Sequence, residues 1–183
     1  MKELQTVDKS LKNKQPSNLE AEQALLGSIL VNNDIIDEIS TIVKSNIFYD
    51  PAHIKIYEVI ESLNNKGMIA NPITLKNFFE KDNMLSDVGG TEYIVKLTRF
   101  SGSVKQAIDY AKIIHEMYLR RELIMVSDKL TEDTLNTNSE DKNAENIIED
   151  TEKSLYDLAE RGTFSQSYLK FNKALDETIK MAT

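Results

Sequence analysis

The sequence contains no cysteine and no tryptophan, and only 3 prolines, among its 183 residues. Without cysteine the chain forms no disulfide and offers no thiolate ligand to a metal, which fits a reducing cytoplasm. No stretch approaches the run of about 20 apolar residues that a membrane-spanning helix needs. Residues 1–18 also lack the apolar centre of a secretory signal peptide. We therefore expect a cytoplasmic protein without a membrane contact.

Signatures of catalysis are also missing. The only two histidines, His53 and His115, lie in different predicted helices without a histidine or cysteine at ligand spacing, so we interpret them as ordinary helix-face or core residues. No P-loop is present, and the pair Gly89-Gly90 lacks the following lysine that would bind phosphate. We predict no catalytic, cofactor-binding or metal-binding residue in this chain.

Charge is unevenly distributed along the sequence. The formal net charge is −8, yet residues 1–18 carry 4 lysines against 2 acidic residues, whereas residues 120–161 carry 6 basic and 12 acidic side chains. An acidic surface repels the phosphates of nucleic acids. We therefore expect residues 120–161 to meet a protein partner with a basic face, and we expect no direct binding to nucleic acid.

The longest periodic stretch runs from Val104 to about Leu135 without proline or glycine, which predicts a single helix about 48 Å long. Ser103, followed three residues later by Gln106, forms a capping box that marks its start. Two apolar stripes are predicted along this helix. The first contains Val104, Ala107, Ile108, Ala111, Ile114 and Tyr118, and the second contains Ile113, Met117, Leu123 and Ile124.

A polar turn at residues 136–143 is followed by a predicted return helix that Gly162 ends. Its apolar side alternates by four and three residues through Ala144, Ile148, Thr151, Leu155 and Leu158. Such an antiparallel hairpin has apolar surface on both sides of its long arm, and the return arm covers only one of them. The rest of the chain or another subunit has to cover the other. Seven positions are therefore candidate interface residues, namely Ile113, Met117, Leu123, Ile124, Ile148, Leu155 and Leu158.

Five shorter helices are predicted before the hairpin, at residues 19–30, 32–44 and 51–65, from Asn71 onward, and after Gly90. Ser17 and Glu20 form a capping box for the first of them, and Gly27 within it indicates that another backbone packs close by. Asp50-Pro51 is a typical start for the third. No segment of useful length alternates with the period of a strand, so the predicted fold class is all-α.

The predicted domain organisation has four parts. Residues 1–16 form a disordered arm, residues 17–102 a compact globular all-α domain, residues 103–162 the helical hairpin, and residues 163–183 a linker with a separate linker helix. A lone amphipathic helix over residues 169–181 is marginal in water, because isolated helices shorter than about 12–15 residues are only marginally stable. Leu175 and Ile179 are therefore predicted to dock on another surface.

Several blocks of sequence occur in an order that is typical of one family. The first is Pro16 with Glu20-Ala21-Glu22-Gln23-Ala24-Leu25-Leu26-Gly27-Ser28-Ile29-Leu30, and the second is Phe48-Tyr49, Pro51-Ala52-His53 and Ile56-Tyr57. Further blocks are Ile73-Thr74-Leu75, Val88-Gly89-Gly90, Tyr93-Ile94, Tyr110-Ala111, Ile113-Ile114 and Leu119-Arg120-Arg121. With looser matches in residues 144–160 and in the linker helix, residues 16–181 resemble the N-terminal part of bacterial replicative DNA helicases of the DnaB type.

In that family the N-terminal tier of a hexamer is an all-α globular domain with a helical hairpin, and a second, RecA-like tier is the ATPase. The resemblance implies that this chain is the first tier and that ATP and magnesium bind only to the absent second tier. The chain alone would then be inactive, while the intact protein unwinds duplex DNA with ATP.

The resemblance also implies partners. Hairpins pair between neighbours, the domains form a collar as a trimer of dimers, and the collar binds the C-terminal domain of primase and, in some bacteria, a helicase loader. The linker helix with Leu175 and Ile179 resembles the element that packs on an adjacent subunit's ATPase domain. The expected location is the replisome in the bacterial cytoplasm.

Two other interpretations remain open. The chain is a stand-alone α-helical adaptor for protein interactions if its natural reading frame ends after Thr183. Alternatively, residues 51–80 form a helix-turn-helix that binds nucleic acid. That interpretation needs a basic recognition helix, but residues 73–81 offer only Lys76 and Lys81 beside Glu80.

Overall fold

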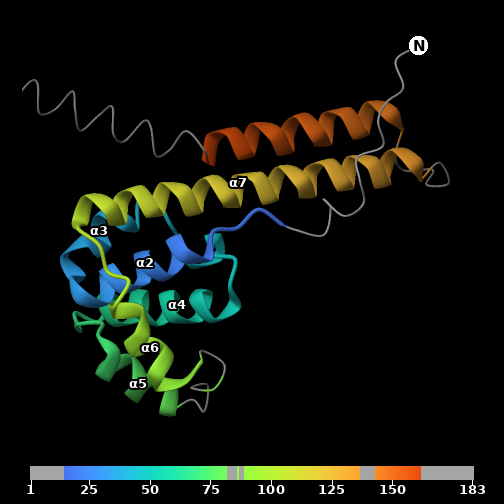
Figure 1. Cartoon of the computed structure of the whole chain (residues 1–183). Coiled ribbons are helices and arrows are strands. Elements are labelled where there is room, and N and C mark those ends of the chain that lie inside the picture. The colour runs from blue at the N-terminus through green and yellow to red at the C-terminus, as the bar shows by residue number, and fades with distance from the viewer. Residues whose placement is uncertain (1–14, 82–85, 87–88, 137–142, 162–183) are drawn as a thin grey trace, which may run out of the picture.

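A computed structural model describes residues 15–81, 86, 89–136 and 143–161. Over these residues the chain forms helices and no strand, which confirms the all-α fold class. A head of short helices lies against the first part of one long helix, and a second helix returns beside the distal part of that long helix (Figure 1). The first 14 residues of the predicted arm, Gly162, and the linker helix with Leu175 and Ile179 lie outside the described residues.

The head contains α2 (Leu19–Val31), the 3-10 turn η1 (Asn33–Ile35), α3 (Ile36–Ile39), the 3-10 turn η2 (Ser45–Ile47), α4 (Pro51–Asn65), α5 (Pro72–Lys81) and α6 (Gly90–Thr98). The long arm of the hairpin is α7 (Val104–Leu135). Residues 144–161 form the other arm, which we call the return helix. Within the described residues, these helices occur in the predicted number and order.

The start of α2 differs from its prediction by one residue. Asn18, and not Ser17, caps the helix, because its side-chain oxygen accepts a hydrogen bond of 2.9 Å from the backbone N–H of Ala21. Both residue types cap helices well, so the spacing of Ser17 and Glu20 alone did not decide between them. With Asn18 as the cap, the third helical position is an alanine, and no reciprocal capping box forms.

The second predicted helix is shorter than expected. It ends at Ile39 and not near Lys44. The hydroxyl of Ser40 donates to the carbonyl of Asp37 at 2.9 Å, and the hydroxyl of Thr41 donates to the carbonyl of Glu38 at 2.7 Å. Such side-chain bonds compete with the helical ladder and favour a turn at this point.

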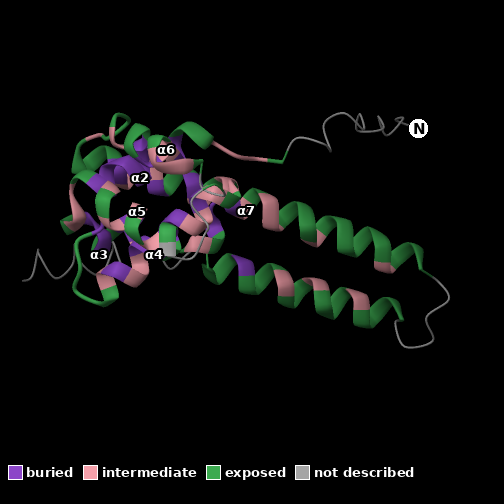
Figure 2. Ribbon diagram, turned by 90° about the horizontal axis from the view of Figure 1, so that it is seen from below, coloured by how far each residue is buried: buried purple, intermediate pink, exposed green. Residues whose placement is uncertain are grey.

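The core of the head is one continuous apolar cluster. Buried residues from every helix of the head contribute to it, and so do Ile47 and Phe48 between α3 and α4. The cluster continues into α7 through Ala107, Ala111, Ile114 and Tyr118. The first four turns of α7 are therefore packed as part of the head, while buried residues become rare further along the hairpin (Figure 2).

Candidate protein–protein interface

The two arms of the hairpin run antiparallel and side by side, as both views show (Figures 1 and 2). The capping box at the start of α7 is present, since Ser103 accepts from the backbone N–H of Gln106 and the Gln106 side chain accepts from the backbone N–H of Ser103. Near the head, Arg161 of the return helix lies 3.9 Å from the carboxylate of Glu122 on α7. The start and length of α7 match the sequence prediction.

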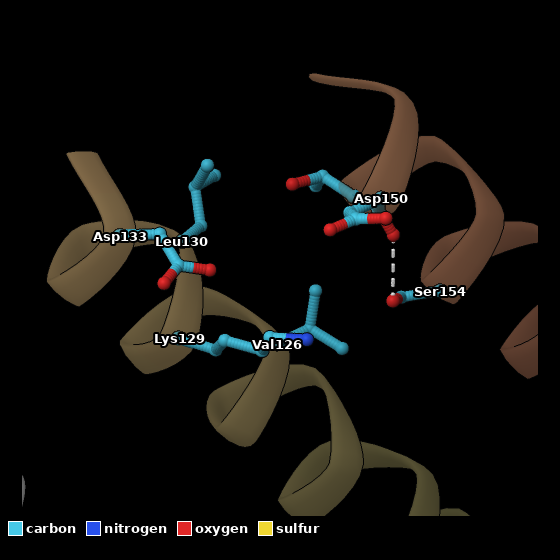
Figure 3. Close-up of a pocket in the computed structure, with 7 residues that line it drawn as sticks. Val126, Lys129, Leu130, Asp133, Asp150 and Ser154 are labelled. Atoms are coloured by element: carbon cyan, nitrogen blue, oxygen red, sulfur yellow. Dashed lines mark hydrogen bonds between the residues drawn. The ribbon is translucent and has the colours of Figure 1, made fainter. Parts of the chain in front are cut away.

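The seam between the arms is loosely packed over its middle part. Val126, Lys129, Leu130 and Asp133 of α7 and Asp150, Thr151 and Ser154 of the return helix line a cavity of about 20 Å³ (Figure 3). The hydroxyls of Thr151 and Ser154 donate within their own helix, to the carbonyls of Ile147 and Asp150, each at 2.7 Å. These two small polar residues therefore leave a gap where larger apolar side chains would fill the seam.

The residues of the return helix that face α7 are not all the ones that the apolar spacing predicts. The less exposed positions of the return helix are Ile147, Thr151, Ser154 and Leu158, whereas Ala144, Ile148 and Leu155 are exposed. The predicted line, which also included Thr151 and Leu158, alternates by four and three residues, and so does the observed line. Periodicity alone therefore could not separate them. Leu158 is only 8% exposed, so it helps to close the single hairpin and is not free for a partner.

An apolar stripe on α7 is left uncovered by the other residues that the structure describes. Ile113 is 38% exposed, Ile124 is 43% exposed, and Met117 between them is partly exposed. At 3.6 residues per turn these three positions fall within roughly 40° of one another around the helix. Leu123 is also exposed but lies about 80° away from Ile113. We refer to Ile113, Met117 and Ile124 as the α7 stripe.

The α7 stripe begins beside a groove and has balanced charges along its edges. The groove, of about 490 Å³, lies between α2 and α7 and is lined by Asn18, Glu20, Ala21, Gln23, Ala24, Phe100, Tyr110 and Ile113. Arg120 pairs with Glu116 at 2.8 Å, and Lys112 lies 3.9 Å from Asp109. The stripe is therefore locally neutral, in contrast to the acidic hairpin as a whole.

Arg121 fixes α7 to the head at the point where the helix leaves it. Its guanidinium donates to the carbonyl of Pro16 at 2.8 Å and to the carbonyl of Ile47 at 2.5 Å. It also lies over the rings of Tyr49 and Tyr118, at 5.5 and 5.9 Å from their centroids. Burial lowers the pKa of Arg121, and the nearby Glu22 carboxylate opposes that effect. In the sequence, Arg121 stood out only as part of the block Leu119-Arg120-Arg121, and no role followed from it.

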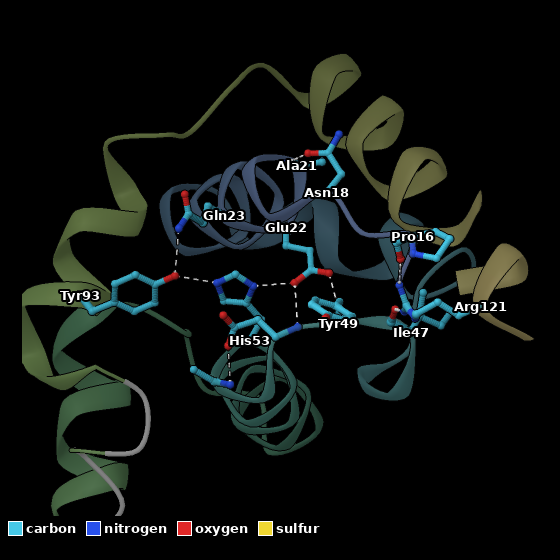
Figure 4. A network of polar contacts seen from close by, with 12 residues as sticks. Pro16, Asn18, Ala21, Glu22, Gln23, Ile47, Tyr49, His53, Tyr93 and Arg121 are labelled. Carbon is cyan, nitrogen blue, oxygen red and sulfur yellow. Dashed lines mark hydrogen bonds and ion pairs between the residues drawn. The ribbon is translucent and has the colours of Figure 1, made fainter. Parts of the chain in front are cut away.

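A buried polar network joins α2, α4 and α6 (Figure 4). The Glu22 carboxylate lies 2.6 Å from His53 Nδ1 and accepts from the backbone N–H of Tyr49 at 2.8 Å. His53 Nε2 lies 2.6 Å from the hydroxyl of Tyr93, which accepts from the amide of Gln23 at 3.1 Å. Every donor is matched when neutral His53 carries its proton on Nδ1 and accepts from Tyr93.

This network joins three helices of the head, and its imidazole is closed to solvent. His53 is 0% exposed and Glu22 is 1% exposed, so a substrate cannot reach the imidazole. Both side chains have hydrogen-bond partners, which satisfies the requirement for buried polar groups. His53 is therefore a core histidine, one of the two predicted interpretations, although nothing in the sequence pointed to its carboxylate partner 31 positions earlier. His115 is half-buried, and burial lowers its pKa while the charge of Glu116 acts in the opposite direction.

The described part of the chain offers neither a metal site nor a membrane span. Its histidine, aspartate and glutamate side chains form no cluster of three or more that could hold a metal ion. None of the helices that the structure describes is long and apolar enough to span a bilayer. What the described residues do offer is a rigid head, a long hairpin fixed to it by Arg121, and exposed apolar side chains along both arms.

These features define an all-α domain with a long helical hairpin that carries exposed apolar side chains. The profile of a family described as DnaB-like helicase N terminal domain matches residues 14–116. The chain belongs to this family.

Similar proteins extend the match over most of the chain. It is 40% identical over 164 residues to the replicative DNA helicase DnaB of Rickettsia bellii, which covers 90% of this chain and 33% of that protein. The crystal structure of the N-terminal domain of DnaB helicase from Mycobacterium tuberculosis is 26% identical, with a TM-score of 0.72, over 79% of this chain and 99% of that one.

A structure of a DnaB-like replicative helicase, described together with its interactions with primase, has the same fold. Its TM-score is 0.63 at 21% identity, over 85% of this chain and 35% of that one. The chain spans about a third of the length of the relatives that it matches, since the covered share of the Rickettsia bellii protein is 33%.

Proposed function

We propose that this chain is the non-catalytic N-terminal collar domain of a replicative DNA helicase, which assembles subunits and docks partner proteins. The observation that carries this proposal is the α7 stripe, an exposed apolar line on a helix that the head and Arg121 hold in place. Neither the head nor the return helix covers it. A second copy of the chain is the partner that we propose for it.

The charges along the α7 stripe suit a contact between identical subunits. A twofold contact brings the same surface together from both sides, so any unbalanced charge would face its own copy. The cations of Lys112 and Arg120 are already paired with Asp109 and Glu116. The acidic return helix lacks this balance, with 6 acidic and 2 basic residues over positions 144–161. We therefore assign self-association to α7, as a dimer and as a trimer of dimers in the intact protein.

Docking of other replication proteins forms the second half of the proposal. It is supported by family membership and by the related helicase whose structure was described together with its interactions with primase. The partners proposed are the C-terminal domain of primase and a helicase loader, in the bacterial cytoplasm. ATP and magnesium would bind a RecA-like domain outside this chain, where the intact protein would unwind duplex DNA.

The double substitution Ile113→Asp and Ile124→Asp tests the assembly role. We expect the unmodified chain to be dimeric or larger by light scattering, and the variant to be monomeric with unchanged helix content. Ile69→Asp, at an exposed position of the head, is the matched control and should leave the mass unchanged. A variant that keeps the full mass would contradict the assignment. Measurable ATP turnover by the purified chain would contradict the non-catalytic role.

A further inference from the structure

The outer face of the return helix combines apolar and acidic side chains. Ile148 is 59% exposed and Leu155 is 44% exposed, and Tyr156 beside them is exposed as well. Four glutamates share this side of the helix, namely Glu145, Glu149, Glu152 and Glu160. At about 100° per residue all seven positions fall within less than half of the circumference. We call this surface, made of these seven residues, the acidic ridge.

The glutamates of the acidic ridge carry uncompensated charge. Over the described residues, none of the four forms an ion pair with a lysine or an arginine, and Glu160 accepts only the hydroxyl of Tyr156, at 3.2 Å. The cations beside the α7 stripe, in contrast, pair with carboxylates on the same helix. The two exposed faces of the hairpin therefore differ in charge although both carry apolar side chains.

The dimensions of the acidic ridge select the shape of its partner. Residues 145–160 extend over about 24 Å, or roughly four helical turns. An amphipathic helix of that length can place its apolar side on Ile148 and Leu155 while its lysines or arginines reach the flanking glutamates. Phosphate backbones are excluded by like charge.

A second copy of this chain is a poor match for the acidic ridge. The copy's hairpin would bring its own glutamates against these, which is unfavourable. Among the described residues of that copy, the 9-residue helix α6 and the residue after it offer only two cations, Lys96 and Arg99, beside Glu92. Lys96 already lies over the ring of Phe100 at 6.0 Å. That helix could meet little more than half of the length of the acidic ridge, since 9 residues span about 14 Å.

We infer that the acidic ridge is a docking site for a helix of another protein, one whose apolar stripe is flanked by lysines or arginines. This inference rests on the proposed docking function and names the chemistry of the partner and the face that receives it. The two surfaces of the hairpin then bind different partners. The neutral α7 stripe binds an identical subunit, and the acidic ridge binds a basic helix of another protein.

The test uses the full chain and a labelled alanine-rich peptide of about four helical turns. Its two leucines are seven residues apart, like Ile148 and Leu155, and four lysines flank them. A control peptide has glutamates in place of the lysines. Fluorescence anisotropy should show binding of the basic peptide only, and this binding should weaken with added salt.

Two matched variants locate the site. The first changes Glu145, Glu149, Glu152 and Glu160 to glutamine, and the second changes Glu20, Glu38, Glu58 and Glu92, which are exposed on the head. Both remove four charges. Exposed ion pairs contribute up to about fivefold each, so we expect the first variant to bind about tenfold more weakly or worse. The second variant should stay within about twofold of the unmodified chain, because distant charges are screened. Leu155→Ser should weaken binding without any change of charge.

Three results would overturn the inference. These are equal weakening by both variants, undiminished binding to the first variant, and a first variant whose own mass in light scattering differs from that of the unmodified chain. The last result would mean that a second copy covers the acidic ridge. The assembly role is tested independently, because the α7 variant with Ile113→Asp and Ile124→Asp should lose self-association and still bind the basic peptide. If that variant kept its mass and bound the peptide, only the assembly role would fail.

Discussion

Replacing Gly27 by alanine sets two physical effects of opposite sign against each other. Gly27 lies inside α2, where alanine is intrinsically better by about 1 kcal/mol. A Cβ atom at this position, however, would lie 2.1 Å from the carbonyl oxygen of Leu97 and 2.9 Å from its carbonyl carbon. Both obstructing atoms belong to the backbone of α6, so no side-chain rotation relieves the contact.

The steric effect should dominate. The closest contact falls 1.3 Å short of the 3.4 Å at which ordinary van der Waals contact begins, so α6 must move away from α2. Leu97 and Ile94 of that helix are buried in the core, and shifting them disturbs its packing. Overpacking of this kind costs about 1–3 kcal/mol, and the contact here places it near the upper end. After the gain in helix propensity, the net loss is about 2 kcal/mol.

Urea unfolding at a fixed protein concentration measures this loss. With a slope of about 2 kcal/mol per molar, the midpoint should fall by about 1 M. Gly67→Ala is the control, because its φ of 68° is left-handed while a Cβ atom added there would meet nothing within 4 Å. Its free energy of unfolding should fall only by the cost of placing alanine in that backbone conformation, about 1 kcal/mol. If Gly27→Ala unfolded at the same urea concentration as the unmodified chain, or at a higher one, the close approach of α2 and α6 would be wrong.

Three further predictions concern the network, the seam and pH. Tyr93→Phe removes the hydroxyl that bonds His53 and Gln23, and should lower the free energy of unfolding by about 1–3 kcal/mol in the same assay. Thr151→Ile should fill part of the seam cavity and add about 0.8 kcal/mol to the hairpin, visible as slower hydrogen exchange in residues 144–161; unchanged exchange would refute the gap. Burial lowers the pKa of His115 below its ordinary 6.5, so the unfolded chain binds a proton first and stability falls as pH drops through 6.5. His115→Gln should remove this part of the pH dependence, measured as urea midpoints on either side of that pH.

The sequence was most informative where a local rule has one outcome. The capping box at Ser103 and Gln106 begins α7 as predicted, and Asp50 caps α4 with proline at its first position. Gly27 indicated a close backbone approach, and the Leu97 carbonyl supplies it. In each case the residues that decide the structure are neighbours in sequence, or a single residue type is compatible with the geometry.

Prediction from the sequence was weaker where contacts with distant residues decide between local structures that fit the sequence equally well. The return helix has two stripes with the same spacing, and only packing against α7 shows that Ser154 faces inward and Leu155 outward. The partner of His53 is 31 residues away, and its second partner, Tyr93, is 40 residues away. No periodicity encodes such a contact. The interface assignment of Ile113, Met117, Leu123, Ile124, Ile148 and Leu155 likewise stays a prediction, because exposure alone does not identify what covers a side chain.

Arg121 connects the packing of the head to the use of the hairpin. Its two hydrogen bonds reach carbonyls from separate segments, at Pro16 before α2 and at Ile47 in η2, so α7 cannot pivot at this point without breaking both. Hydrogen bonds to charged groups contribute about 1.5–3 kcal/mol each, so such a pivot is disfavoured by several kcal/mol. The α7 stripe and the acidic ridge are therefore presented at a fixed angle to the head before any partner arrives. Surfaces that are already ordered lose less entropy on binding, which favours a domain whose task is assembly.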